Sequence, residues 1–269
     1  LLIVFLVIWN IPYFQSNYFL SGKQEIPFWS YFLMIHNFFM ANYETLGNDT
    51  LSITWSIGIE EQFYLLFPFL IYFLDKKWIP WLLGTLVFVA IGFRSLFDHW
   101  IPRYVLLPAR MDGLAIGFLI GYLNQTGLLD KHRKQILTAS MFIFPVILVT
   151  CAFLYWKYGD LGVGKHTLFA IVFGIMIIYA LKLSRSWYGS LLRNKALMWI
   201  GTISYSLYLF HYLMLVLVFH FAGYTGTGIF GIKEVILVIV AFISSLIISW
   251  LIYRLLEQPM VKIGKRFTY

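Results

Sequence analysis

Residues 232–256 decide the fold class, and they read IKEVILVIVAFISSLIISWLIYRLL. After Glu234 this stretch carries no charged side chain until Arg254. A helix that crosses the hydrocarbon core of a bilayer needs about 20 predominantly apolar residues. The apolar residues here are continuous and do not alternate with polar ones, so the stretch predicts a membrane-spanning helix rather than a strand.

The composition of the whole chain agrees with this prediction. Of its 269 residues, 61% are hydrophobic, 20% are aromatic and only 12% are charged. A soluble protein carries about a quarter charged residues, so a soluble enzyme, a disordered chain and a secreted disulfide-linked protein are poor interpretations. The single cysteine, Cys151, excludes an intrachain disulfide and a cysteine-rich metal site. We therefore predict an all-α, polytopic transmembrane helix bundle that forms one domain over residues 1–269.

Other apolar stretches are long enough to cross a bilayer. Together with the first they make about eight predicted spans, at residues 1–20, 55–74, 79–97, 106–123, 136–156, 165–182, 197–219 and 232–256. Residues 28–41 are apolar and aromatic but too short to span, so we expect a re-entrant or interfacial segment there. The chain begins inside an apolar stretch, and we expect an N-terminal part to precede it.

Basic residues gather in alternate loops between the predicted spans. The loops rich in Lys and Arg are 75–77, 124–135, 182–196 and the C-terminal tail. The poorer loops are 42–54, 98–105, 157–165 and 220–231. Because basic loops stay in the cytoplasm, the pattern predicts a cytoplasmic C-terminus. These loops also explain the net charge of +8 without a nucleic-acid partner.

Polar residues open the predicted span 55–74. Ionisable side chains at span ends are costly in a bilayer and are therefore functional candidates, here Glu60 and Glu61 beside Trp55. Acidic residues also suit the positive end of the helix dipole, so helix capping is an alternative role. Adjacent residues lie about 100° apart on a helix. We expect at least one of the two glutamates to face the protein interior.

Arg110 and Asp112 lie at the outer end of the span 106–123. Residues two apart do not face each other on a helix, so we expect their partners on other helices. Glu60, Glu61 and Arg94 have a suitable depth. A structural network of salt bridges is the alternative to a direct role in chemistry.

Tyr208 and His211 share one face of the span 197–219, because they are three residues apart. A histidine in an apolar helix commonly hydrogen-bonds to a neighbouring helix. It also suits a general base near neutral pH. The sequence leaves both roles open.

Arg254 and Glu257 lie at the inner end of the last span, also three residues apart. An ion pair within the helix is therefore one interpretation. An arginine at a cytoplasmic opening also suits a donor that carries phosphate groups. We expect Pro259 to end the helix.

These four motifs resemble those of the acyltransferase 3 family, multi-pass membrane enzymes that acylate cell-envelope glycans. The stretch TWSIGIEEQFY at 54–64 matches the family pattern T-W-S-x-x-x-E-E-Q-F-Y. Similar matches to the family are ARMDG at 109–113, GTISYSLYLFH at 201–211 and YRLLEQP at 253–259. Ile53 stands where many members have a histidine.

The resemblance implies transfer of an acyl group, expected to be acetyl, from cytoplasmic acetyl-CoA or another acyl-CoA without a metal. The acceptor would be a hydroxyl of an envelope polysaccharide or a lipid-linked sugar, at a bacterial inner (plasma) membrane. The intact family fold has about ten spans, and its early ones hold a histidine and an arginine motif that this chain lacks. Neither His36 nor His211 takes over those roles. The candidate site residues are Glu257, Glu61 and Glu60 for catalysis and Arg254, Arg110, Asp112, Tyr208, His211 and Trp55 for substrate binding.

Two other functions remain open. A transporter or flippase of a lipid-linked glycan also places ionisable residues inside a bundle, although transporters more often show repeated halves. An inactive fragment of the acyltransferase is the other alternative. The aromatic and amide side chains of residues 21–54 suit sugar binding, but interfacial belts have the same composition.

Overall fold

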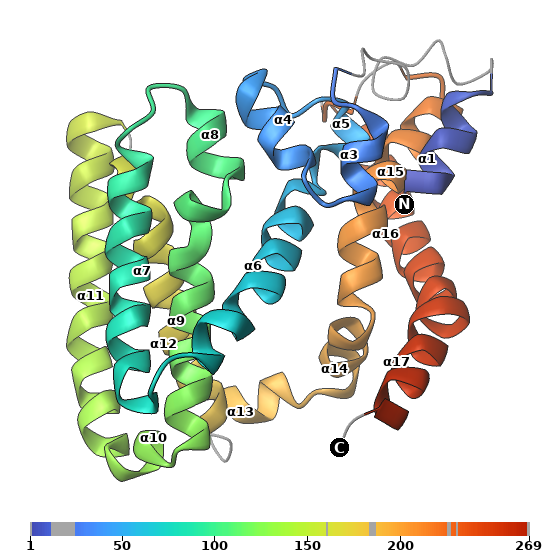
Figure 1. The fold of residues 1–269 in the computed structure, drawn as a ribbon. Helices are drawn as coiled ribbons and strands as arrows, with labels where there is room; N and C mark the ends of the chain where they lie inside the picture. Colours follow the sequence, from blue (N-terminus) through green and yellow to red (C-terminus); the bar gives the residue numbers. More distant parts are fainter. Residues whose placement is uncertain are drawn as a thin grey trace. The chain divides into compact units, whose positions relative to one another are not determined.

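The structure is a computed structural model that describes residues 2–11, 25–159, 161–182, 187–224, 227–229 and 231–267. All regular secondary structure within these ranges is helical, as Figure 1 shows, which confirms the all-α prediction. The chain divides into two compact units. Unit 1 comprises Leu1–Pro27, Leu46–Thr54 and Asn194–Tyr269, and unit 2 comprises Phe28–Thr45 and Trp55–Arg193.

In the described part of the chain, 6 helical segments are long and apolar enough to cross a membrane. They are Lys76–Arg94, Trp100–Gln125, Arg133–Tyr158, Gly162–Lys182, Ser204–Phe221 and Ile232–Gly264. The predicted span 55–74 forms helix α6 (Trp55–Tyr72), whose polar first turns make it less apolar than these segments. Of the predicted span 1–20, the structure describes helix α1 (Leu2–Trp9), and residues 12–20 lie outside the described ranges. The chain is thus polytopic, and the number of eight spans stays a prediction.

Unit 2 is built from long helices that pack side by side (Figure 1). Helix α9 (Leu107–Gln125) contacts both α7 (Ile79–Arg94) and α12 (Lys165–Lys182), and α12 contacts α11 (Arg133–Tyr158). A buried apolar cluster joins α6, α7 and α9, and it contains Phe63, Phe67, Ile79, Leu83 and Ala115. Two short helices, α10 (Leu128–Lys131) and α13 (Trp187–Leu192), lie in the connections that follow α9 and α12.

Residues 28–41 form short helices rather than a span. Helix α3 (Phe28–Phe32) and helix α4 (His36–Asn42) are separated by a turn in which Met34 adopts a positive φ of 55°. Helix α4 packs against α8 (Trp100–Val105) and against the start of α6. This agrees with a segment that does not cross the bilayer.

Unit 1 is centred on two long helices that pack along each other, α15 (Ser204–Phe221) and α16 (Ile232–Ile252). Small buried side chains, Ser206 on α15 and Ser245 and Ser249 on α16, permit this close approach. Helix α14 (Lys195–Thr202) precedes α15, so the predicted span 197–219 is broken at Ile203. Helix α5 (Asp49–Ser52) also contacts α15.

The end of α16 differs from the prediction that Pro259 ends the helix. A π-helical turn, η4 (Tyr253–Glu257), follows α16, and helix α17 (Gln258–Gly264) continues from it. Pro259 lies in the first turn of α17, where its missing N–H leaves no intrahelical bond unmade. The prediction was wrong because the π turn had already reset the hydrogen-bond pattern.

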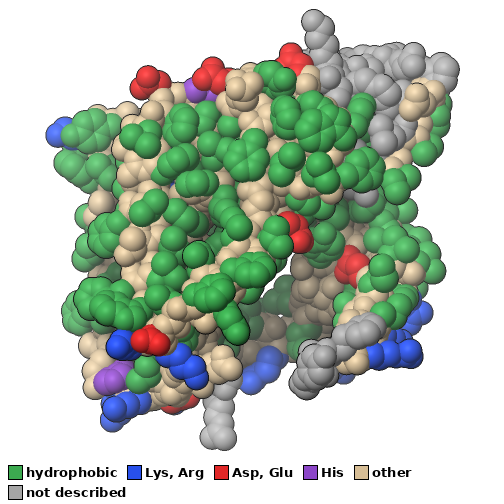
Figure 2. Space-filling view, viewed as in Figure 1, with side chains coloured by type: hydrophobic (Ala, Val, Ile, Leu, Met, Phe, Trp, Pro, Cys, Tyr) green, Lys and Arg blue, Asp and Glu red, His purple; other side chains and the backbone are tan. Residues whose placement is uncertain are grey.

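Many of the basic residues of unit 2 gather at one end of its long helices. Six basic residues, Lys76, Lys77, Lys131, Arg133, Lys134 and Lys182, lie where α7 and α11 begin and where α9 and α12 end. Figure 2 shows many blue side chains gathered at this lower end, with red beside them, and further red side chains along the upper edge. Lys182 forms an ion pair of 2.7 Å with Asp130 there. The basic loops thus lie at one end of unit 2, and the cytoplasmic location of that end stays a prediction.

Candidate functional site

A buried ion pair joins three helices of unit 2. Arg94 Nη1 on α7 lies 3.0 Å from Asp112 Oδ2 on α9, and the two side chains are only 1% and 2% exposed. The same guanidinium donates to Thr167 Oγ1 on α12 at 2.7 Å and to the carbonyl oxygens of Ala109 and Val163, each at 2.6 Å. Thr167 in turn donates its hydroxyl to Asp112 Oδ2. Arg94 is thus the partner of Asp112. A substrate-binding role for Asp112 stays a prediction.

Arg110 takes no part in that network. Its guanidinium lies over the rings of Trp55, at 5.5 Å, and Tyr104, at 5.4 Å. Those two rings are themselves 4.3 Å apart. The Nη1 atom of Arg110 is buried and has no hydrogen-bond partner among the described residues. Stacking stabilises the charge by about 0.5–2 kcal/mol, but it leaves this N–H group without an acceptor.

At the start of α6, the residue that faces the protein interior is not the one that the sequence predicted. Both Glu60 and Glu61 are exposed, and neither forms an ion pair with Arg110 in the described part of the chain. Gln62 turns inward instead. Its Nε2 donates to Met34 O at 2.7 Å and to Asn37 Oδ1 at 2.8 Å. The expectation of an inward glutamate was therefore wrong for these residues.

Gly58, two residues before Glu60, makes room for a buried histidine. A Cβ atom at position 58 would lie 3.1 Å from His36 Cε1. The His36 ring is stacked on Tyr31, with centroids 4.5 Å apart and an interplanar angle of 11°. Part of the T-W-S-x-x-x-E-E-Q motif thus serves to dock α6 against the short helices α3 and α4.

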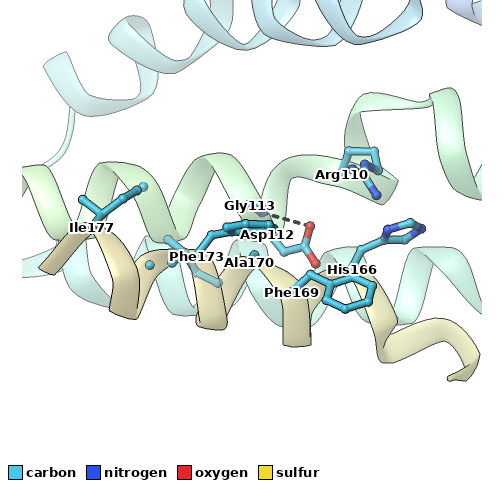
Figure 3. A pocket seen from close by; sticks show the side chains of 11 residues that line it. Arg110, Asp112, Gly113, His166, Phe169, Ala170, Phe173 and Ile177 are labelled. Atoms are coloured by element: carbon cyan, nitrogen blue, oxygen red, sulfur yellow. Dashed lines mark hydrogen bonds between the residues drawn. The ribbon is translucent and has the colours of Figure 1, made fainter. Parts of the chain in front are cut away.

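A cavity of about 380 Å³ lies between α9 and α12. Figure 3 shows Arg110 and His166 together at one end of it and Ile177 at the other, with Asp112, Ala170 and the rings of Phe169 and Phe173 between them. The remaining lining residues are Gly113, Ile116, Gly117 and Gly174. The cavity therefore has a polar end and a long apolar wall.

In unit 1 two sequence motifs meet at Glu257. Its carboxylate accepts a hydrogen bond from the hydroxyl of Ser206, which is buried on α15. Arg254 lies over the Trp250 ring at 5.1 Å and makes no ion pair with Glu257 in the described ranges. The intrahelical pair that the spacing suggested is thus absent, because the turn from Tyr253 to Glu257 is π-helical rather than α-helical.

Tyr208 and His211 do share a face, as expected, and their rings are 6.0 Å apart. The Tyr208 hydroxyl donates to Ile53 O at 2.9 Å. His211 is exposed, and its Nδ1 lies 2.7 Å from Tyr208 O. A carbonyl oxygen only accepts hydrogen bonds, so Nδ1 carries the proton and Nε2 of the neutral ring is left as the basic nitrogen. The two contacts of His211 Nδ1, with Leu207 O and Tyr208 O, lie within α15 and do not join two helices.

The sequence of the chain matches a known protein family. A family model described as an acyltransferase domain, Acyl_transf_3, matches residues 1–254. The chain belongs to the acyltransferase 3 family. This confirms the resemblance carried by the four motifs.

Two bacterial relatives of this acyltransferase 3 chain illustrate the match. O-acetyltransferase OatA of Staphylococcus aureus is 29% identical over 237 residues, which cover 82% of this chain and 38% of the relative. Peptidoglycan O-acetyltransferase OatA of Listeria monocytogenes is 27% identical over 254 residues, which cover 87% of this chain and 39% of the relative. The chain thus spans less than two fifths of the length of these relatives. No solved structure matches it.

Several residues of this acyltransferase 3 domain were not predicted as site residues. Ser206 lies inside the G-x-I-S-Y-S-L-Y-L-x-H segment, so its place in a motif was a usable signal. Gln62 likewise lies in the T-W-S motif. Thr167 and His166 are on α12, outside every motif, and no sequence pattern marked them. Among the described residues, no group of His, Cys, Asp or Glu side chains converges to hold a metal ion.

Proposed function

We propose that the chain is the membrane domain of an O-acetyltransferase that moves an acetyl group from cytoplasmic acetyl-CoA to a hydroxyl of a cell-envelope glycan. The observation that carries this proposal is the family match over residues 1–254. Both relatives are O-acetyltransferases by name, and one is named for peptidoglycan. The proposed acceptor is an envelope polysaccharide such as peptidoglycan, or its lipid-linked sugar, and the proposed location is the bacterial plasma membrane.

The donor end of this reaction suits Glu257 and Arg254. As a hydroxyl oxygen bonds to the thioester carbonyl carbon, the hydroxyl loses its proton and the C–S bond breaks to release the CoA thiol. The Glu257 carboxylate, held by Ser206, is the base proposed to accept that proton. Arg254 supplies a cation for the phosphate groups of the donor and for the negative charge on the carbonyl oxygen.

The polarity of unit 1 supports a cytoplasmic donor. Lys262, Lys265 and Arg266 follow the π turn directly, so Glu257 lies near the basic end of α16 and α17. Basic residues mark the cytoplasmic side of membrane proteins. His211 is in the same unit, and its Nε2 has the character to accept a hydrogen bond from substrate.

The acceptor end is assigned to unit 2. The Trp55 ring is a surface on which a sugar can stack, and Arg110 lies over it. Glu60 and Glu61 are exposed in the next turn of α6, where their carboxylates suit hydrogen bonds to sugar hydroxyls or a second proton transfer. Asp112 anchors the helix that carries Arg110.

The test is a Glu257→Gln substitution in the native protein in its own membrane. A positioned base contributes about 10²–10⁴-fold to a rate, so envelope O-acetylation, measured as base-released acetate, should fall at least a hundredfold. Membrane abundance of the protein should not change. The matched control is Glu234→Gln, at the opposite end of α16, where the carboxylate accepts from Tyr224 Oη at 2.8 Å. Full acetylation in Glu257→Gln would refute the role of this carboxylate.

A further inference from the structure

The cavity between α9 and α12 has a charge at one end that nothing in the described structure neutralises. Asp112 lines the same cavity as Arg110 and carries a carboxylate. That carboxylate is already bonded to Arg94 and Thr167. A guanidinium is not deprotonated in proteins, so Arg110 carries a positive charge. Its buried Nη1 has no acceptor among the described residues. An unpaired charge inside a membrane protein is costly, and an anion placed here relieves that cost.

The rest of the cavity is apolar and faces sideways. Phe169, Phe173 and Ile177 on α12 line it, and their side chains are 46%, 62% and 47% exposed. Both α9 and α12 belong to segments that are long and apolar enough to cross the membrane. The exposed edge of the cavity therefore meets the hydrocarbon of the bilayer, which is the phase from which a ligand would enter.

Glycines create the space that an aliphatic chain needs. Gly113 and Gly117 on α9 and Gly174 on α12 line the cavity. Gly174 lets α12 approach α9 closely, because a Cβ atom there would lie 3.1 Å from Ile116 and from Ile120. A Cβ atom added at position 117 would meet no atom within 4 Å, so this wall is open. A volume of about 380 Å³ lies at the lower end of the range of small-molecule sites, about 300–1,000 Å³. Its apolar lining by Phe169, Phe173 and Ile177 suits an aliphatic chain better than a sugar.

We infer that the cavity binds an anionic amphiphile of the bilayer, with its phosphate or carboxylate on Arg110 and one aliphatic chain along Phe169 and Phe173 (Figure 3). His166 lies at the polar end beside Arg110 and supplies a second hydrogen-bonding group. The anionic group completes the hydrogen bonding of Nη1, and a charge-assisted bond to a guanidinium is the strong kind. Phospholipids and free fatty acids share this chemistry. The site shares Arg110 with the proposed acceptor end, but it requires no acyl donor. Its test measures lipid retention rather than acetyl transfer, so the two proposals can fail separately.

Native mass spectrometry of the purified protein tests the inference. The probes are phosphatidylglycerol, phosphatidylcholine with the same chains, and palmitate, each added to delipidated protein. We expect one tightly retained phosphatidylglycerol and weaker retention of phosphatidylcholine. A hydrogen bond to a charged group is worth about tenfold or more in affinity, so Arg110→Gln should reduce phosphatidylglycerol retention about tenfold. Arg110→Lys, which keeps the charge, should retain it better.

A second pair of variants blocks the cavity without touching the charge. Gly117→Leu places a side chain into the open space, and it should abolish retention of the tight lipid. The matched control is Gly121→Leu, because position 121 lies on the same helix, also has open space around an added Cβ, and does not line the cavity. Retention of palmitate alone would support the site and identify a fatty acid as its source. Equal retention of the tight ligand in Gly117→Leu and in the unmodified protein would overturn the inference. Tight retention of phosphatidylcholine, at the same level as phosphatidylglycerol, would also overturn it.

Discussion

Asp112→Asn should destabilise the protein far more than its small change in shape suggests. The substitution keeps the size of the side chain and its ability to accept from Thr167, but it removes the negative charge. Arg94 would then keep its positive charge while 1% exposed, with only neutral acceptors around it. The perturbation thus isolates the charge of the pair from its packing.

The magnitude follows from the burial of the pair. Breaking a buried ion pair by removing one partner costs about 3–5 kcal/mol, because the other charge stays uncompensated. Solvent screening does not reduce this figure here, since the two side chains are 1% and 2% exposed. In a chain of this size each kcal/mol lowers Tm by about 2–4 °C. Asp112→Asn should therefore lower Tm by about 6–20 °C.

The assay is thermal unfolding of the detergent-solubilised protein, with Asp75→Asn as the matched control. Asp75 lies 3.6 Å from Lys77, and those side chains are 76% and 72% exposed, so this pair contributes little. The double variant Arg94→Met with Asp112→Leu should lose less stability than Asp112→Asn, because no buried charge is left alone. If Asp112→Asn and Asp75→Asn gave the same Tm, the charge on Asp112 would not stabilise the helix junction and the reasoning would fail.

Two further substitutions test other contacts. Ser206→Ala removes the hydroxyl that donates to Glu257, so envelope O-acetylation should fall about tenfold at unchanged protein abundance. Ser206→Thr keeps a hydroxyl and should retain the activity. Full activity of the alanine variant would argue against a positioning role for Ser206. Gly58→Ala places a Cβ atom 3.1 Å from the buried His36 ring and should lower stability by about 1–3 kcal/mol. Gly92→Ala, where an added Cβ meets no atom within 4 Å, is its control in thermal unfolding, and equal Tm values would contradict the close packing at Gly58.

The fold class could be predicted because lipid requires a simple pattern. Continuous apolar runs such as residues 232–256 become helices whatever packs around them. The partner of Asp112 was also predictable, since Arg94 lies at a matching depth on the preceding span. Both inferences depend on depth in the membrane. Residue number gives that depth directly, because a helix rises about 1.5 Å per residue.

Rotation about a helix axis was harder to predict. Glu60, Glu61 and Gln62 are consecutive, so the helical period alone does not say which of them faces inward, and the Asn37 amide that selects Gln62 comes from another segment. The π turn at Tyr253–Glu257 is similar, because the expected Arg254–Glu257 pair assumed α-helical spacing. The cavity beside Arg110 also depends on the glycines of two helices, and only the packing of α9 on α12 brings them together.

The bonds of Arg94 also bear on the order in which the helices assemble during synthesis. Its partners on α9 are only 15 and 18 residues further along the chain. Val163, just before α12, and Thr167, in its first turn, are 69 and 73 residues further. Because chains emerge from the ribosome N-terminus first, α7 and α9 can form a neutral hairpin before α12 exists. Thr167 and Val163 then accept further hydrogen bonds from the Arg94 guanidinium, whose charge Asp112 already compensates. We expect α7 and α9 to enter the bilayer as a pair, and α12 to pack against them afterwards.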